Sequence, residues 1–291
     1  MCWFIYSHFF ILLIVIYLSN GVAIESYGQL RKRVMLGQKA LLFEFPFQVA
    51  VQQRLNDRWV LLCGGVLVTE KKVLTAADCF DRLRAYNVRV IVGVLDIYGP
   101  PNQYEQTIYV SNIYKHESID DELQYWNPHN IAVITLATAV KLNLNVQLAK
   151  FAQNTTQYIN IKIPEKMKPP CVITGWGYTE NSILPNTLQK ASTRILPNNI
   201  CHHWFPWFQD AFNNGLFICV LNKSDFDTQE EVESNGPCFG DNGGPLMCGP
   251  NNQNLELVGI GSYVEPTCMP SAFPSVYVHL PAYRKWLSDK L

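Results

Sequence analysis

The chain has 291 residues, of which 48% are hydrophobic and 16% are charged, and its formal net charge is −1. This composition is typical of a packed globular protein and excludes a largely disordered chain. The near-zero net charge and the lack of long charge runs give no indication of nucleic-acid binding. The length suffices for one large domain or two small ones with full hydrophobic cores.

The N-terminal stretch differs from the rest of the chain. Residues 9–18 read F-F-I-L-L-I-V-I-Y-L, an unbroken apolar run followed by S-N-G-V-A, although no positive charge precedes it. The run is about half of the roughly 20 residues that span a bilayer, which favours a signal peptide over residues 1–23 rather than a membrane anchor. The sequence therefore predicts a secreted protein, free of the membrane after cleavage. The sequons at Asn154 and Asn222 are expected to carry glycans in that compartment.

A short polar segment follows the predicted signal peptide. Residues 24–33 end in the basic triplet R-K-R. The triplet predicts a propeptide that is cleaved after Arg33 to free Val34, and the alternative is an ordinary solvated charge cluster. Residues 34–291 are then expected to form the globular domain.

The globular part reads as a series of short strands. Runs rich in β-branched residues are separated by turn residues, and they predict strands at 45–52, 60–68, 88–94, 106–113, 130–136, 171–177, 255–263 and 275–280. Helical periodicity is weak until residues 282–291, which predict a short terminal helix. Many short strands at regular spacing predict an all-β barrel or sandwich.

The cysteines agree with an exported protein. The chain has nine, and Cys2 leaves with the signal peptide. An even number then remains, which indicates disulfides: Cys63, Cys79, Cys171, Cys201, Cys219, Cys238, Cys248 and Cys268. Metal binding would require close ligand pairs such as C-x-x-C, which are absent, and His202 and His203 beside Cys201 make a poor zinc site. No metal and no other cofactor is expected.

Five motifs in chain order carry a resemblance to a known family. They are C-G-G (63–65), L-T-A-A-D-C-F (74–80), N-I-A-V-I-T-L (130–136), C-V-I-T-G-W-G (171–177) and G-D-N-G-G-P-L (240–246). Together they resemble the chymotrypsin/trypsin-like serine peptidases, from about Val34 to Leu291. The resemblance implies an all-β fold of two packed six-stranded antiparallel barrels with a short C-terminal helix. The active cleft of that family lies between the barrels.

The resemblance also implies a changed catalytic triad. The family writes T-A-A-H-C, D-I-A and G-D-S-G-G-P, in which a serine attacks, a histidine takes its proton and an aspartate orients the histidine. Here Asp78, Asn130 and Asn242 stand at the histidine, aspartate and serine positions. An amide is not a nucleophile of this kind, Asp78 is a weak base, and neutral Asn130 cannot stabilise a cation. His129 is not expected to substitute, because neighbouring strand residues point to opposite faces.

Three further positions concern the specificity pocket. By the resemblance, Gly236 lies at the pocket base, where trypsin-like members carry an acidic residue, so no carboxylate would receive a Lys or Arg side chain. Val264 and Ser275 stand where the family usually keeps wall glycines, so their side chains should narrow the pocket unless neighbouring loops shift.

The scaffold of the family is retained by the same alignment. It implies the disulfides Cys63–Cys79, Cys171–Cys248, Cys201–Cys219 and Cys238–Cys268. Gly240 stands at the oxyanion-hole position, and Asp241 stands where active members receive the amino group that activation frees, here that of Val34.

Two loops are longer than is usual in the family. Residues 202–212 are dense in aromatic side chains, which suit either an interface or simple packing against the barrel. Residues 224–234 are acidic, and they suit either a contact surface for a basic partner or a solvated loop.

Three functions remain in competition. The first is a secreted, non-catalytic homologue that binds other secreted proteins, such as active proteases or their substrates, as a cofactor, regulator or decoy in a body or reproductive fluid. The second is a working endopeptidase with altered catalytic residues. The third is a carrier that uses the vacated cleft. The three changed positions favour the first; the sequence gives no oligomeric state.

Overall fold

The computed structural model describes residues 37–119, 127–159, 171–178, 185–221, 237–238, 240–250, 254–263 and 274–291. Several predicted features lie outside these ranges: the signal peptide and propeptide, Arg33 and Val34, Asn222, the acidic loop 224–234, Gly236, Val264 and Cys268. No helix in the described ranges is both long and apolar enough to span a membrane.

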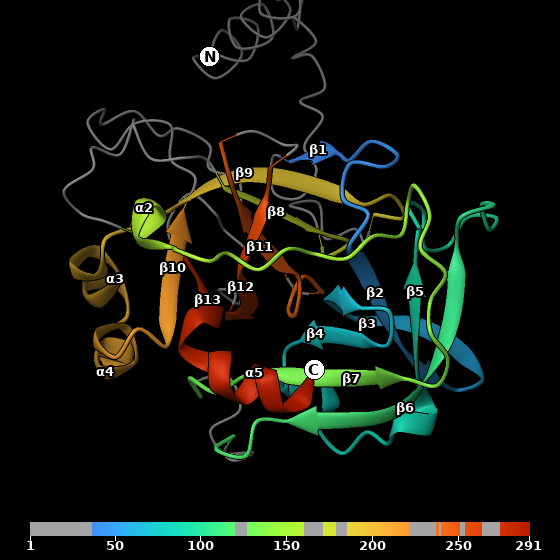
Figure 1. The fold of residues 1–291 in the computed structure, drawn as a ribbon, viewed down its shortest axis with the longest axis horizontal. Helices are drawn as coiled ribbons and strands as arrows, with labels where there is room; N and C mark the ends of the chain where they lie inside the picture. The colour runs from blue at the N-terminus through green and yellow to red at the C-terminus, as the bar shows by residue number, and fades with distance from the viewer. Residues whose placement is uncertain are drawn as a thin grey trace, which may run out of the picture. The chain divides into compact units, whose positions relative to one another are not determined.

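The first half of the described chain forms a closed antiparallel barrel (Figure 1). Its strands are hydrogen-bonded in the order β2-β3-β4-β7-β6-β5. Their bounds are β2 (Gln48–Leu55), β3 (Arg58–Thr69), β4 (Lys72–Thr75), β5 (Val88–Val92), β6 (Gln106–Lys115) and β7 (Ala132–Leu136). The predicted strands at 45–52, 60–68, 88–94, 106–113 and 130–136 all fall in this barrel.

The second half forms another antiparallel barrel, in the order β9-β10-β13-β12-β11-β8, and pairing between β8 and β9 closes it. The bounds are β8 (Cys171–Gly175), β9 (Gln189–Ile195), β10 (Phe217–Leu221), β11 (Pro245–Cys248), β12 (Glu256–Tyr263) and β13 (Ser275–His279). A short strand, β1 (Gln38–Lys39), pairs with β9. The expectation of two six-stranded antiparallel barrels is confirmed.

Alternation of side chains explains why these segments form barrel strands. Successive residues of a strand point to opposite faces, and β9 shows this period, with every second side chain buried from Gln189 to Ile195. One buried apolar cluster, including Val49, Val51 and Val90, fills the first barrel. Another cluster contains residues of both barrels together with Leu287 near the C-terminus, so it joins the two halves.

The hairpin between β2 and β3 is set by its turn residues. Leu55 pairs with Arg58, leaving a two-residue loop of Asn56 and Asp57. Both residues have positive φ, at 47° and 61°. A two-residue loop with positive φ at both positions is the turn that matches strand twist, and Asn and Asp tolerate it best.

The helices are short and mostly belong to the second half. They are the 3-10 turns η1 (Asp78–Phe80), η2 (Ala85–Asn87), η5 (Pro206–Phe208) and η6 (Leu280–Tyr283), and the helices α2 (Thr156–Ile159), α3 (Asn198–Trp204), α4 (Gln209–Asn213) and α5 (Arg284–Lys290). The predicted terminal helix is therefore present as α5, but Ala282 and Tyr283 belong to the 3-10 turn before it.

Each described disulfide links two cysteines within the same half of the chain. Cys63–Cys79, Cys171–Cys248 and Cys201–Cys219 form as the resemblance implied. Cys238 is also disulfide-bonded, while its expected partner, Cys268, lies outside the described residues.

Candidate functional site

The loop that carries Asn242 is attached to the first barrel by hydrogen bonds. The backbone N–H of Gly64 in β3 donates to the carbonyl oxygen of Asn242 at 2.8 Å. The hydroxyl of Thr75, the last residue of β4, donates to the carbonyl oxygen of Gly64 at 2.7 Å. Asp78 lies three residues beyond Thr75, so the same strand end supports both candidate residues.

The next residue, Gly243, shows why this loop is rich in glycine. Its φ is +76°, and a Cβ placed on it would lie 2.2 Å from the Thr75 hydroxyl oxygen. Only glycine combines this backbone conformation with so close an approach. Its N–H donates to the carbonyl oxygen of Gly261 in β12 at 2.9 Å. The loop is therefore held between β12 of the second barrel and the β4 end of the first.

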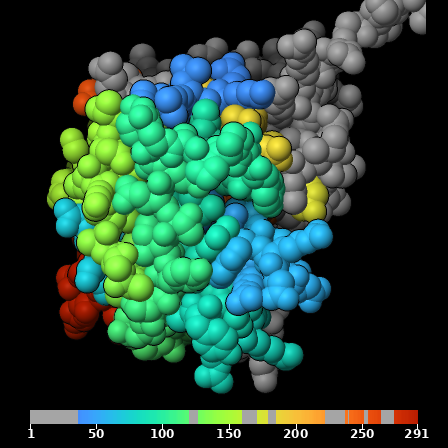
Figure 2. Space-filling model, turned by 90° about the vertical axis from the view of Figure 1, so that its right-hand side faces the viewer, coloured from blue at the N-terminus to red at the C-terminus, as the bar shows by residue number. Residues whose placement is uncertain are grey.

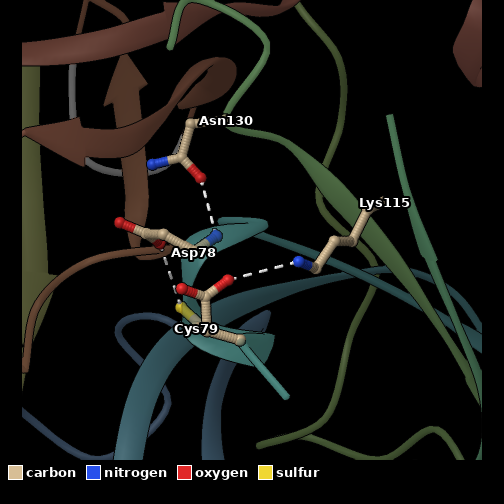
Figure 3. A network of polar contacts seen from close by, with 5 residues as sticks. Asp78, Cys79, Lys115 and Asn130 are labelled. Carbon is tan, nitrogen blue, oxygen red and sulfur yellow. Dashed lines mark hydrogen bonds and ion pairs between the residues drawn. The ribbon is translucent and has the colours of Figure 1, made fainter. Parts of the chain in front are cut away.

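Asn130 connects Asp78 to the second barrel (Figure 3). Its Oδ1 accepts the backbone N–H of Asp78 at 2.9 Å. Its Nδ2 donates to the carbonyl oxygen and to the hydroxyl oxygen of Ser262 at 3.3 and 3.2 Å. Asn130 is fully buried, and these bonds satisfy both ends of its amide. The side chain therefore fixes the backbone of Asp78, and its contact with the carboxylate lowers the pKa of Asp78 against the effect of burial.

The Asp78 carboxylate is short of partners. Its Oδ2 is buried and has no hydrogen-bond partner. Its Oδ1 lies 3.7 Å from Cys79 Sγ, but that sulfur is in the disulfide with Cys63 and has no proton to donate. The nearby Lys115 forms an ion pair at 3.3 Å with Asp81 instead (Figure 3). Burial raises the pKa of Asp78 to about 6, and the Asp81 charge acts in the same direction, against the opposing effect of Asn130.

Asn242 is also left with an unpaired acceptor. Its Oδ1 is buried and no described donor reaches it. Its backbone N–H and that of Gly240, where φ is +98°, donate to no acceptor within the described ranges. The site thus offers two free N–H groups and two unpaired side-chain acceptors. Its described residues include no hydroxyl or thiol hydrogen-bonded to a base.

Asp241 lies on the other side of the same loop and is buried. The N–H of Gly177 donates to its Oδ1 at 2.7 Å, and the N–H of Cys238 donates to its Oδ2 at 3.0 Å. A Cβ on Gly175 would lie 1.9 Å from Asp241 Oδ1, so the G-W-G motif must keep glycine there. Burial raises the pKa of Asp241 to about 6, and the two N–H donors oppose that rise.

If cleavage frees the Val34 amino group, pairing of that group with Asp241 gives a testable difference. A buried carboxylate gains most from a charged partner, because an unpaired buried charge is costly. Asp241→Asn should therefore lower the melting temperature of the cleaved protein more than that of the uncleaved protein. Thermal unfolding of both forms checks this, after N-terminal sequencing of the cleaved form. Equal decreases in the two forms would exclude the ion pair.

The described contacts of the His129 ring lead away from the candidate site, although the expected reason is wrong, because β7 begins only at Ala132. Its ring stacks on His116 with centroids 4.6 Å apart, and its Nδ1 lies 3.2 Å from the hydroxyl oxygen of Tyr283. Neither contact is with Asp78 or Asn242. The structure therefore provides no support for His129 as a replacement base.

The remaining predicted positions are partly described. Ser275 is buried as the first residue of β13, but Gly236 and Val264 lie outside the described residues, so the pocket walls stay a prediction. Asn154 is exposed, and its Oδ1 accepts the N–H of Thr156 at 2.9 Å.

The aromatic loop 202–212 folds into α3, η5 and α4. Phe205, Phe208 and Phe212 are buried, and Phe208 and Phe212 form ring contacts with Phe217 of β10. The packing interpretation is thus correct for these three rings. Trp207 is 58% exposed, although its ring contacts those of Phe205 and Phe208.

Two supporting residues were not singled out by sequence reasoning. Thr75 positions the loop of Asn242, and Ser262 receives the Asn130 amide. Thr75 ends the apolar strand β4 inside a recognised motif, and Ser262 is the next-to-last residue of β12. A polar residue near the end of an apolar strand was the signal that could have identified them. Among the described residues, no group of three or more His, Cys, Asp or Glu side chains could hold a metal ion.

Comparisons with known proteins identify the family and agree with the two-barrel fold. Residues 35–287 match the family described as Trypsin. The chain is 32% identical to a protein named fibrinolytic enzyme, isozyme C, of Lumbricus rubellus, over 88% of this chain and 99% of that protein. It is 30% identical to chymotrypsin-like elastase family member 1 of Macaca fascicularis, over 93% and 94% of the two chains. Among solved structures, neuropsin, titled a serine protease of mouse brain, matches 87% of this chain and 98% of its own, with 27% identity and a TM-score of 0.66.

Proposed function

The chain belongs to the trypsin family of serine peptidases, and from that premise we propose that it is a secreted member without peptidase activity that acts by binding other proteins. Residues 1–23 are its signal peptide, 24–33 its propeptide and 34–291 its folded domain. Its partners are other secreted proteins, such as active proteases or their substrates. The alternative is an active serine endopeptidase with altered catalytic residues, since relatives carry enzyme names.

The observation that carries the proposal is the bonding of Asp78. Triad chemistry needs a proton to pass from a nucleophile to a base that a third group orients. Here Asn130 bonds to the backbone of Asp78, and Asp78 Oδ2 and Asn242 Oδ1 are both unpaired acceptors. Neither atom has a proton to pass to the other while Asp78 is ionised. In subtilisin, an unrelated fold with the same chemistry, loss of the serine or the histidine lowers turnover about 10⁶-fold.

Loss of the reaction leaves the binding scaffold in place. Both barrels close, three of the four expected disulfides are described, and the loop 240–244 keeps its glycine-dependent conformation. A family member of this kind can compete with or assist an active protease through surfaces outside the triad. Trp207 is one candidate contact, because exposed Trp side chains are frequent interface anchors.

The proposal is tested by adding the purified protein to active proteases of its native fluid and measuring their rates on peptide substrates. A regulator or decoy should change those rates, and Asn242→Ala should change them equally, because residue 242 has no chemical role. Trp207→Ala should weaken the effect, whereas Tyr86→Ala, which removes an exposed ring from the first half of the chain, serves as its matched control. Peptide cleavage by the protein alone that disappears in Asn242→Ala would establish the active alternative.

A further inference from the structure

Two stacked histidines lie where the C-terminal segment meets the first barrel. His116 directly follows β6 and His129 lies three residues before β7. Their ring centroids are 4.6 Å apart with an interplanar angle of 9°. His116 also contacts Tyr283 and Trp286, at centroid distances of 5.4 and 5.2 Å. Figures 1 and 2 both place the red C-terminal segment beside the green part of the first barrel.

The hydrogen bonds show that this packing requires a neutral His116 ring, whereas the bond of His129 can form in either protonation state. The N–H of Ser118 donates to His116 Nδ1 at 3.2 Å, so that nitrogen must carry a lone pair. The Tyr283 hydroxyl donates its single hydrogen to the carbonyl oxygen of Pro128 at 2.7 Å. His129 Nδ1, 3.2 Å from that hydroxyl oxygen, must then be the donor in its contact. A proton on His116 Nδ1 would face the Ser118 N–H and remove its acceptor.

The described charged groups near the pair are engaged with one another. Among the described residues, the charged groups near the pair are Glu117 and Lys290, with Asp289 next to Lys290. Glu117 accepts from Lys290 Nζ at 2.6 Å and from Trp286 Nε1 at 2.7 Å. The bond from Lys290 holds the pKa of Glu117 at about 2, so Glu117 stays ionised and paired. Two imidazolium rings in a stack would repel each other.

We propose that His116 and His129 form an acid-sensitive latch that fastens the segment from Tyr283 to Lys290 to the first barrel, and that double protonation releases this segment. Its release would uncover Leu287, which packs in the cluster shared by both barrels. The latch does not depend on whether the protein is a peptidase.

The pKa values of both histidines are lowered in the closed segment, which is consistent with this geometry. Burial lowers the pKa of His116, with further decreases from His129 and Lys290 that outweigh the opposite effect of Glu117, and burial lowers the pKa of His129. The closed segment therefore binds fewer protons than the open one. Closure is complete above the ordinary histidine pKa of about 6.5 and weakens as pH falls below it.

Hydrogen exchange of the α5 amides tests the latch. In the wild-type protein, the protection factors of α5 should fall about tenfold or more from about pH 7.5 to about pH 5, since one pKa unit is a factor of ten in the opening equilibrium. The protection factors of the β2 and β3 amides should change less. In the double variant His116→Gln/His129→Gln, the protection factors of the α5 amides should change by less than about threefold between the same two pH values. His203→Gln, which replaces an exposed histidine of α3, should behave as the wild type.

Two results would overturn the proposal. One is an equal fall in α5 protection in the double variant and in the wild type. The other comes from wild-type protein alone and remains available if the double variant does not fold: an NMR titration in which both rings protonate at their ordinary pKa and independently of each other.

Discussion

Asp78→His, Asn130→Asp and Asn242→Ser combined should produce a protein that hydrolyses small activated esters but cleaves peptides poorly. The reacting groups would then be of the right types, and Asn130 already bonds to the backbone of residue 78 and to Ser262. The free N–H groups of Gly240 and residue 242 would supply oxyanion donors, each worth about 3 kcal/mol. Ester hydrolysis should rise roughly 10³-fold or more over the parent protein.

Peptide cleavage should lag because it also depends on holding the substrate. Much of the attack geometry comes from a side chain seated in the specificity pocket. Val264 and Ser275 are predicted to obstruct that pocket, and Gly236 provides no charge for a basic side chain. Comparison of kcat/KM for an ester and a peptide is the measurement. Val264→Gly and Ser275→Gly, added to the triple variant, should raise peptide cleavage more than ester cleavage.

Efficient peptide cleavage by the triple variant alone would contradict the obstructed pocket. If its kcat/KM for peptides matches that of ordinary members of the family, then the pocket is open. Inactivity would in that case rest on residues 78, 130 and 242 alone.

Asp78→Asn should stabilise the protein by about 2 to 3 kcal/mol near pH 7.5. The folded-state pKa of about 6 exceeds the ordinary value of 3.8, and each unit corresponds to about 1.4 kcal/mol. Asp78 is thus charged at neutral pH without a partner for Oδ2, and an amide removes that cost. Because the site is not wholly closed to solvent, the lower end of the range is the better expectation.

The sign of the pH dependence follows from the same shift. Between about pH 4 and pH 6 the folded state binds more protons than the unfolded state, so stability falls as pH rises through this window. Asp241, whose pKa is also raised to about 6, contributes in the same direction. Asp78→Asn should therefore reduce the fall without abolishing it, and near pH 3.5 the variant and the parent should be equally stable.

Denaturant unfolding at several pH values measures this effect. Asp210→Asn, at an exposed position of α4, is the matched control and should change stability by less than about 0.5 kcal/mol. A variant that is less stable than the parent at pH 7.5 would mean that the Asp78 carboxylate has a stabilising partner.

The strands that were predicted from the sequence differ from those that were missed in their length and in how clearly their hydrophobic pattern shows. Val88–Val92 and Ala132–Leu136 are rich in β-branched residues and are buried on most sides, so local pattern was sufficient. Lys72–Thr75 has four residues, too few to show a period. Gln189–Ile195 buries polar Gln189 and Thr193 on its inner face, which hides the hydrophobic alternation.

The helices in the aromatic loop were missed for another reason. Isolated helices shorter than about 12 residues are marginal in water and depend on tertiary packing. α3 has seven residues and α4 has five, and contacts such as that between Phe208 and Phe217 hold this region on the barrel. No local pattern in residues 198–213 could reveal those distant partners.

The identities of the site residues followed from motifs, but their state did not. The sequence placed Asp78, Asn130 and Asn242 at three family positions. It could not show that Asn130 would bond to the Asp78 backbone, or that Lys115 would form its ion pair with Asp81 and not with Asp78. Those outcomes depend on the meeting of the two barrels, which is a long-range property of the fold.

Labelling with a fluorophosphonate probe, read by intact-mass spectrometry, tests directly whether the protein has a catalytic nucleophile. Such a probe reacts with an activated hydroxyl nucleophile, and Asn242 has none. We predict no adduct on the parent protein and an adduct at residue 242 in the triple variant that restores the triad residue types. An adduct on the parent that survives Asn242→Ala and maps to another side chain would contradict the proposed lack of peptidase activity, because the chain would then possess a working nucleophile.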